Sequence, residues 1–280
     1  MLPRRLRSSF YRSFSWRVAK RLHAELSVSV AGGSRMSVST SDQVGRVLAI
    51  SGVWEPPSTA VFTSVLRPGD ICLDIGAHIG YFTLLASRLV GPRGHVYAFE
   101  PSPSSYAALC DNLARNRVQN VTALAVAVGG TPGEAVLHEG PGTNTGRSTL
   151  RDRQPNGVPI TTKGVVVDVR TPISCVPEQE LRRIRLIKID VEGYEVEVLS
   201  GLAPILELRG RLAVLVEFNP AWSAHEHPID YLADLCREQG FAMQRLSAGY
   251  SLETLFPARA NPPVAITSVP PHECDLLLTR

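Results

Sequence analysis

The chain has 280 residues, of which 44% are hydrophobic and 20% are charged, values typical of a globular protein with a sizeable core. The whole chain has a net charge of +3. Residues 1–24 hold seven basic residues and no acid, so residues 25–280 have a net charge of −4. This balance argues against a basic nucleic-acid binder, and we expect no nucleic-acid partner. No apolar run reaches the ~18–20 residues that cross a bilayer, and we expect no secretory signal.

Residues 1–24 and the five cysteines indicate where in the cell the protein is expected to lie. Leu6, Phe10, Phe14 and Val18 recur at a spacing of four, as in an amphipathic helix that contacts a membrane surface. The Arg- and Ser-rich composition is also typical of an organellar transit peptide, and a solvated leader is the third interpretation. The five cysteines are widely spaced and form no CxxC pair, which favours a reducing compartment and a cytoplasmic location.

Regular alternation of strands and helices begins after Pro68-Gly69. We interpret residues 1–50 as the basic leader and an N-terminal cap, and residues 51–280 as the main domain. A hydroxyl at the N-cap and a proline at the first helical position mark a helix start at Ser102-Pro103. The pattern predicts a strand at 71–75, a helix at 79–89, a strand at 95–99, a helix at 103–113 and a strand at 121–128.

Residues 129–184 interrupt this alternation. Glu134–His138 and Val165–Val169 have the pattern of strands, and the Gly-, Thr-, Asn- and Pro-rich stretch between them is long enough to indicate a functional loop. We expect this insertion to shape a substrate pocket. The alternation then resumes with strands at 186–189, 212–218, 241–246 and 275–279, and with helices at 195–206 and 228–239.

The order of these elements predicts the fold class. Strands that alternate with helices form parallel sheets with right-handed crossovers. We therefore expect an α/β fold with a doubly wound, mostly parallel, seven-stranded, Rossmann-like sheet. In such a sheet ligands bind at the carboxyl ends of the strands.

The first chemical signal is the segment from Asp74 to Gly80, which follows one strand and opens a helix. Gly76 permits a close backbone approach, and the helix start offers free N–H groups. Glu100 ends the next strand, where its carboxylate can accept both hydroxyls of a ribose. A purely structural glycine turn is the alternative interpretation.

The details of this turn favour S-adenosylmethionine over a dinucleotide. A dinucleotide fingerprint reads GxGxxG, but His78 stands where its second glycine would be. Asp74, two residues before the first glycine, would repel a pyrophosphate, whereas it suits the amino group and sulfonium of S-adenosylmethionine.

Further acids follow the later strands. Asp190 and Glu192 come after the strand at 186–189, and Glu217 and Asn219 end the strand at 212–218. These side chains could take a proton from a substrate hydroxyl or bind a divalent cation. They could also form a hydrogen-bonded acid cluster or cap helices. No ligand-dense loop is present, so we predict no metal site.

Three blocks of the chain resemble the FkbM-type methyltransferases. They are the run from Gly69 through Glu100-Pro101, the Asn112-x-x-x-Asn116 stretch and the segment Leu186–Gly201 with its phrase Lys-Ile-Asp-Val-Glu-Gly-Tyr-Glu. The likeness covers about residues 52–220. It implies a class I methyltransferase sheet, S-adenosyl-L-methionine as the cofactor, and O-methylation of a sugar, glycan or natural-product hydroxyl.

The resemblance also assigns residue roles. It implies methionine contacts from Asp74, Gly76 and Gly80, a ribose contact from Glu100 and an adenine border at Ala127. Ser148, within a Ser-rich turn, would face the substrate together with Asn219. His78 stands where the family more often has Asn. The remaining residues that the resemblance places around the cofactor are Glu55 of the aromatic-Glu-Pro segment, Ala77, His78, Tyr81 and Pro101.

We therefore expect an S-adenosylmethionine-dependent methyltransferase with a small-molecule or glycan acceptor. Asp190 and Glu192, followed by Glu217, are the candidate catalytic bases. An NAD(P)-dependent oxidoreductase with a Rossmann domain and a non-enzymatic S-adenosylmethionine-binding protein are the alternatives. An RNA methyltransferase is disfavoured because the chain has no aromatic stacking platform.

Overall fold

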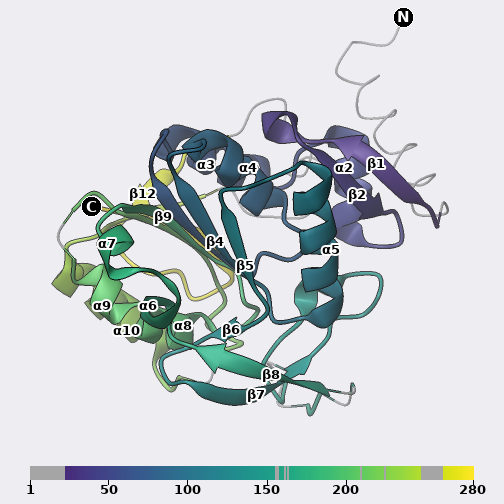
Figure 1. Ribbon diagram of the computed structural model, residues 1–280. Coiled ribbons are helices and arrows are strands. Elements are labelled where there is room, and N and C mark those ends of the chain that lie inside the picture. The colour runs from purple at the N-terminus through teal and green to yellow at the C-terminus, as the bar shows by residue number, and fades with distance from the viewer. Residues whose placement is uncertain are drawn as a thin grey trace, which may run out of the picture.

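Figure 1 shows a central sheet with helices on both faces, in a computed structural model of the chain. The predicted leader helix, with Leu6 to Val18, lies outside the described residues. Among the described helices, none is both long enough and apolar enough to cross a membrane. The structure describes residues 23–154, 158–160, 162, 164–208, 210–223, 225–246 and 261–280.

The central sheet has eight strands. β5, β4, β3, β9 and β10 are all parallel, whereas β13 runs antiparallel between β10 and β11. The predicted mostly parallel sheet is confirmed, but the count of seven is wrong, because the exposed β12 has only three residues, too few to show a strand pattern. In spatial order the strands are β12 (Val264–Ile266), β11 (Ala242–Arg245), β13 (Cys274–Thr279), β10 (Ala213–Phe218), β9 (Ile184–Ile189), β3 (Ile71–Ile75), β4 (His95–Phe99) and β5 (Val121–Leu124).

Both faces of this sheet are covered, as β3 illustrates. Ile71, Leu73 and Ile75 belong to the core that includes residues of α8, α9 and α10, and Cys72 belongs to the core on the α3 and α4 side. Successive side chains of a strand point to opposite faces, so a doubly covered strand is apolar almost throughout. The helices are α3 (Pro56–Val65), α4 (Tyr81–Val90), α5 (Pro103–Arg115), α6 (Pro172–Cys175), α7 (Glu178–Leu181), α8 (Glu195–Gly201), α9 (Ala203–Leu206) and α10 (Pro228–Gln239).

The predicted helix signals hold at most positions. The Ser102 hydroxyl accepts a hydrogen bond from the Ser105 N–H, and Gly240 ends α10 with a left-handed φ of 71°. The single helix predicted at 195–206 is wrong, because it is interrupted at Leu202. Pro204 lacks an amide hydrogen and its ring crowds the preceding turn, so the second segment starts anew as α9.

The strand predicted at 121–128 is also divided. β5 stays in the central sheet and ends at Leu124, whereas β6 (Ala127–Val128) pairs with β8 (Gly164–Arg170) in a separate three-stranded sheet. β7 (Gly133–His138) completes that sheet, so the two strands expected in the insertion are confirmed. A largely apolar segment such as 121–128 does not reveal where the chain passes from one sheet to another.

The weakly patterned N-terminal region forms a hairpin of β1 (Glu25–Ser29) and β2 (Arg35–Ser39), joined by the short turn η1 (Ala31–Gly33) and followed by α2 (Gln43–Ser51). Met36 and Leu48 are fully buried in the same core as α4. This packing places the start of α2 beside the carboxyl edge of the sheet. The boundary at residue 50 stays a prediction.

Candidate active site

A cavity of about 380 Å³ opens at the carboxyl ends of β3, β4, β9 and β10. The order of the strands reverses beside β3, with β4 on one side and β9 on the other. The carboxyl edge at such a point is where ligands bind in open α/β sheets, and the volume lies in the range of small-molecule sites.

The structure brings most of the predicted site residues together around this cavity. Asp74, Gly80 and Asn219 are the exceptions and do not line it. The predicted residues in the lining are Glu55, Gly76, Ala77, His78, Tyr81, Glu100, Pro101, Ala127, Ser148, Asp190, Glu192 and Glu217.

The turn from Gly76 to His78 is held by Glu100. The Glu100 carboxylate accepts the His78 N–H at 2.7 Å and the Ser102 N–H at 2.9 Å, while burial raises its pKa to about 7. A Cβ at Gly76 would lie 1.8 Å from the Asp190 carbonyl oxygen. Gly76 is therefore required for the close approach of two backbone segments of the protein, and its expected contact with the cofactor stays a prediction.

Asp74 lies under the cavity, on the α4 side of the sheet. Its Oδ2 accepts a 2.5 Å hydrogen bond from the Thr83 hydroxyl, and its side chain is fully buried. Burial raises its pKa, and the Lys188 charge opposes that rise. Gly80 serves packing, because a Cβ there would lie 2.5 Å from Leu109 Cδ1 of α5. The expected cofactor contacts of both residues stay predictions.

Lys188 is the central site residue that sequence reasoning missed. Its ammonium lies 2.8 Å from Asp190 Oδ2 and 5.0 Å from the centre of the Phe82 ring, with only 3% of the residue exposed. Burial alone lowers the pKa of Lys188, but Asp190, Asp74 and Glu55 together raise it above its ordinary value. A lysine inside the otherwise apolar run Leu186–Ile189 was the available signal, because lysines are rarely buried without a partner.

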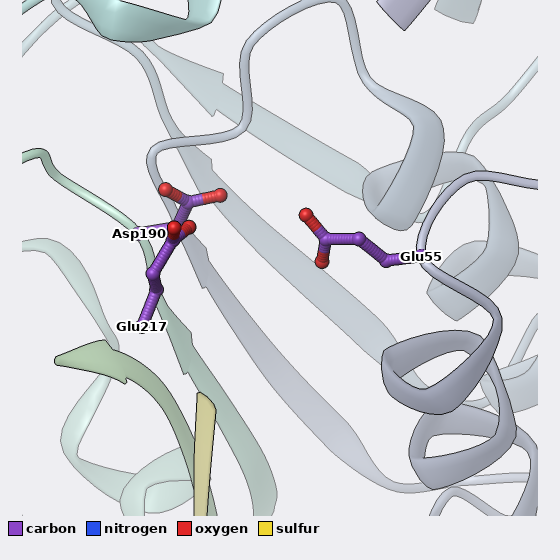
Figure 2. A group of neighbouring side chains, drawn as sticks. All are labelled: Glu55, Asp190 and Glu217. Atoms are coloured by element: carbon purple, nitrogen blue, oxygen red, sulfur yellow. The ribbon is translucent and has the colours of Figure 1, made fainter. Parts of the chain in front are cut away.

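Three carboxylates meet at one end of the cavity, as Figure 2 shows. Glu55, the residue directly before α3, extends toward Asp190 and Glu217 at the edge of the sheet. One carboxylate oxygen of each residue lies within 4.8 Å of those of the other two. Burial, then Asp275 and Asp190, raise the pKa of Glu55 to about 8, and burial followed by Asp190 raises the pKa of Glu217 well above its ordinary value.

Asp190 differs from these neighbours. Burial raises its pKa, but the Lys188 charge and hydrogen bonds from Lys188 and Glu217 outweigh burial and leave the pKa below its ordinary value. Close carboxylates cannot all ionise together, so the acids around Asp190 retain protons while Asp190 stays ionised.

The same three carboxylates have the chemistry of cation ligands, yet we predict that activity does not need a metal. The Lys188 ammonium already supplies positive charge to Asp190, at 2.8 Å. Turnover and cofactor affinity should therefore be unchanged after dialysis against EDTA. A loss of turnover that Mg²⁺ restores would contradict this prediction and make Glu55, Asp190 and Glu217 ligands.

Glu192 lies in the bend after β9 and faces the cavity. Its φ of 51° is left-handed, and its carbonyl accepts a 2.7 Å hydrogen bond from the Thr149 hydroxyl. Burial, with Asp190 as the next cause, raises the pKa of the Glu192 carboxyl to about 8, although the Arg147 charge opposes the rise. Backbone strain of this kind is concentrated at functional sites.

β13 adds acids that no local pattern indicated. Asp275 is paired in register with Glu217 of β10, and burial raises its pKa to about 7. Glu273 lines the cavity and accepts a 2.7 Å hydrogen bond from the Asn219 amide. Asn219 is thereby engaged outside the cavity lining, and its predicted substrate contact stays a prediction.

The insertion forms the remaining wall. Residues 144–148, which include the turn η2 (Thr145–Arg147), line the cavity, and the Arg147 guanidinium lies 5.7 Å from the centre of the Trp222 ring. The Ser148 hydroxyl donates to the Thr145 carbonyl and accepts from the Gly140 N–H, so it also shapes the loop.

The raised pKa values of Glu55 and Glu192 predict how the thermal stability of the protein depends on pH. Glu55 and Glu192 ionise at about pH 8 in the fold against an ordinary 4.5, so they keep protons that the unfolded chain releases. Their contribution is complete below pH 4.5 and is lost as the pH rises to about 8. Thermal unfolding should show a Tm at pH 8 below that at pH 5, by at least the ~2–4 °C that one kcal/mol produces in a chain of this size. A higher Tm at pH 8 would contradict these pKa directions.

The chain is similar to proteins of one family over more than half of its length. Residues 74–243 match the family described as "Methyltransferase FkbM domain". The chain is 34% identical over 160 residues to "31-O-demethyl-FK506 methyltransferase FkbM" of Streptomyces tacrolimicus, which covers 49% of this chain and 61% of that protein. It is 23% identical over 175 residues to "Hexuronic acid methyltransferase AglP" of Haloferax volcanii, covering 62% and 66%.

The chain thus spans less than two thirds of the length of either relative. Among solved structures it is similar to "Methyltransferase FkbM from Methylobacillus flagellatus KT", with 12% identity, a TM-score of 0.46, and coverage of 96% of this chain and 59% of that one. The family match itself extends from Asp74 in β3 to Met243 in β11, and so includes the turn, Glu100 and the acids after β9 and β10. The chain belongs to the FkbM methyltransferase family.

Proposed function

We propose that this chain is an S-adenosylmethionine-dependent methyltransferase that methylates a hydroxyl of a small molecule, sugar or glycan. Family membership supports the reaction type. The names of two relatives, an O-demethyl-FK506 methyltransferase and a hexuronic acid methyltransferase, support a natural product or a sugar as the acceptor class.

The observation that carries this proposal is the predominance of acidic residues in the lining of the cavity. Lys188 and Arg147 are the lysine and arginine side chains in its lining, and Lys188 is bound to Asp190. A lining so rich in carboxyl groups offers many hydrogen-bond acceptors to the ammonium group and ribose hydroxyls of S-adenosylmethionine, and it offers few cationic partners to a pyrophosphate. The acids in the lining are Glu55, Glu100, Asp190, Glu192, Glu217 and Glu273.

S-adenosylmethionine would supply an electrophilic methyl group on a sulfonium. In our assignment the backbone from Gly76 to His78 holds its methionine part, Glu100 accepts the ribose hydroxyls and Ala127 borders the adenine. Glu100 keeps acceptor capacity for this role, because each carboxylate oxygen accepts one backbone N–H and has a further lone pair.

The chain's own contribution to the reaction is alignment and proton removal. Alignment of two reactants can supply ~7–11 kcal/mol of the barrier. Asp190, held ionised by Lys188, accepts a hydrogen bond from the acceptor hydroxyl and orients it. Glu192 takes the proton in its ionised form, whose share grows as the pH rises toward its pKa of about 8, a value near the working pH of a general base.

Calorimetric titration tests the cofactor directly. We expect S-adenosylhomocysteine to bind the purified chain and NADH to give no heat of binding, whereas the reverse result would support the oxidoreductase alternative. Release of S-adenosylhomocysteine is then measured with a panel of hydroxylated sugars and natural products. Cofactor binding without turnover on any acceptor would favour the non-enzymatic alternative.

A further inference from the structure

Hydrogen bonds among His78, Thr145 and Asp42 connect the loop at residues 140–148 to the turn at residues 76–78, which we call the cofactor turn. His78 Nε2 lies 2.8 Å from the Thr145 hydroxyl oxygen. The Thr145 N–H and hydroxyl both donate to Asp42 Oδ2, at 2.9 and 3.2 Å. Asp42 is also the N-cap of α2, where its Oδ1 accepts the Val44 N–H at 2.9 Å.

The two contacts of the Thr145 hydroxyl share a single proton. Where this hydroxyl donates to Asp42, its oxygen accepts from the Nε2 tautomer of His78, and where it donates to His78 Nε2, the Thr145 N–H keeps the bond to Asp42. The three residues form a connected path from the cofactor turn, through the loop, to the start of a helix in the N-terminal cap.

The backbone of His78 connects the same residue to Glu100. Its φ of 50° is left-handed, a conformation in which Asn, Asp and His are enriched among non-glycine residues. In this conformation its N–H donates to Glu100 Oε2 at 2.7 Å. One residue thus contacts both the carboxylate assigned to the ribose and the loop that forms a wall of the cavity.

We infer that His78 and Thr145 are positioning residues. Their hydrogen bond, which we call the clasp, holds the 140–148 loop against the cofactor turn. Closure of the loop and retention of the cofactor therefore depend on each other. The coupling to cofactor rests on the proposed function. The clasp is a property of the chain without ligand. Asp42 anchors the clasp to α2, and the Gln43 N–H adds a 3.1 Å hydrogen bond to the Thr143 carbonyl of the same loop.

Amide hydrogen exchange of the full chain without ligand tests the clasp. Thr145→Val keeps the side-chain shape but removes the hydroxyl, and we expect residues 140–148 to exchange about 3–10 times faster, the size of effect that a lost hydrogen bond produces. Thr143→Val is the matched control in the same loop, because Thr143 contacts α2 through its backbone carbonyl, which the substitution keeps. Thr145→Ser should restore slow exchange.

Exchange in Thr145→Val equal to that of Thr143→Val, with an unchanged Tm, would overturn the clasp. If Thr145→Val does not fold, His78→Asn gives the same measurement, because Asn tolerates the left-handed backbone but lacks the ring nitrogen. Exchange at wild-type rates in His78→Asn would then overturn it.

Stopped-flow dissociation of S-adenosylhomocysteine tests the coupling. Each variant, His78→Asn and Thr145→Val, should dissociate about 3–10 times faster than the wild type. The double variant should be no faster than the faster single variant, because both changes remove the same connection. Additive effects would overturn the coupling. A wild type that does not bind S-adenosylhomocysteine refutes the proposed function, while the exchange result still decides the clasp.

Discussion

Replacement of Lys188 by methionine is expected to lower the free energy of unfolding at pH 7 by about 3–5 kcal/mol, as when one partner of a buried ion pair is removed. Lys188 is 3% exposed and its ammonium lies 2.8 Å from Asp190 Oδ2. Without it, Asp190 and the fully buried Asp74 lose the positive charge that favours their ionised forms. Denaturant unfolding followed by circular dichroism measures the difference.

The pH dependence of the free energy of unfolding shows whether Lys188→Met loses stability through the missing charge or through poorer packing. Asp190 has a lowered pKa in the wild type, so its contribution is present above the ordinary value of 3.8 and is lost as the pH falls through the folded-state pKa. In Lys188→Met that contribution is absent, so the difference in stability between the two proteins should shrink only as the pH falls below 3.8, through the folded-state pKa of Asp190. Arg237→Met is the control, because its side chain is 73% exposed and should change stability by less than about 0.5 kcal/mol. A pH-independent deficit would indicate lost packing instead.

Replacement of Glu192 by glutamine is expected to lower kcat by about 10²–10⁴, the usual contribution of a general base. Glutamine preserves the size of the side chain and adds no new branch at the left-handed φ of 51°, so the bend after β9 should persist. The dissociation constant of S-adenosylhomocysteine should therefore stay within about threefold of the wild type. Steady-state kinetics with the acceptor found in the panel, together with calorimetry, provide both values.

Two further variants make this result specific. Asp190→Ala should reduce turnover as well, and retained turnover would remove Asp190 from the mechanism. Glu178→Gln, at an exposed acid of α7 outside the cavity, should leave kcat unchanged. A Glu192→Gln enzyme with wild-type kcat would show that another acid, such as Glu217 or Glu55, takes the proton.

Sequence reasoning was most accurate where the signal was local. The turn after β3, the capping of α5 by Ser102 and the acids that follow β9 and β10 each lie within one strand and its adjoining segment. Parallel strands bring their carboxyl ends to the same edge, so the meeting of Glu100, Asp190 and Glu217 at one cavity could be expected from the amino-acid sequence.

Other parts of the site depend on contacts between distant segments. Glu273 and Asp275 reach the acid cluster because β13 pairs with β10, and Thr145 meets Asp42 across 103 residues of sequence. Strand alternation also placed Asp74 on the α4 side, away from the cavity lining. Sequence periodicity reports which residues share a face but does not report what packs against that face.

By itself, then, the amino-acid sequence determined the alternating strands and helices, the covered sheet and the carboxylates at its edge, because apolar periodicity and capping act within a few residues. Only the tertiary structure decided the charge state of those carboxylates. Lys188 keeps Asp190 ionised, while burial leaves Glu55 and Glu192 protonated up to about pH 8. Solvation and distance to neighbouring charges set these pKa values, and both exist only once the chain is packed.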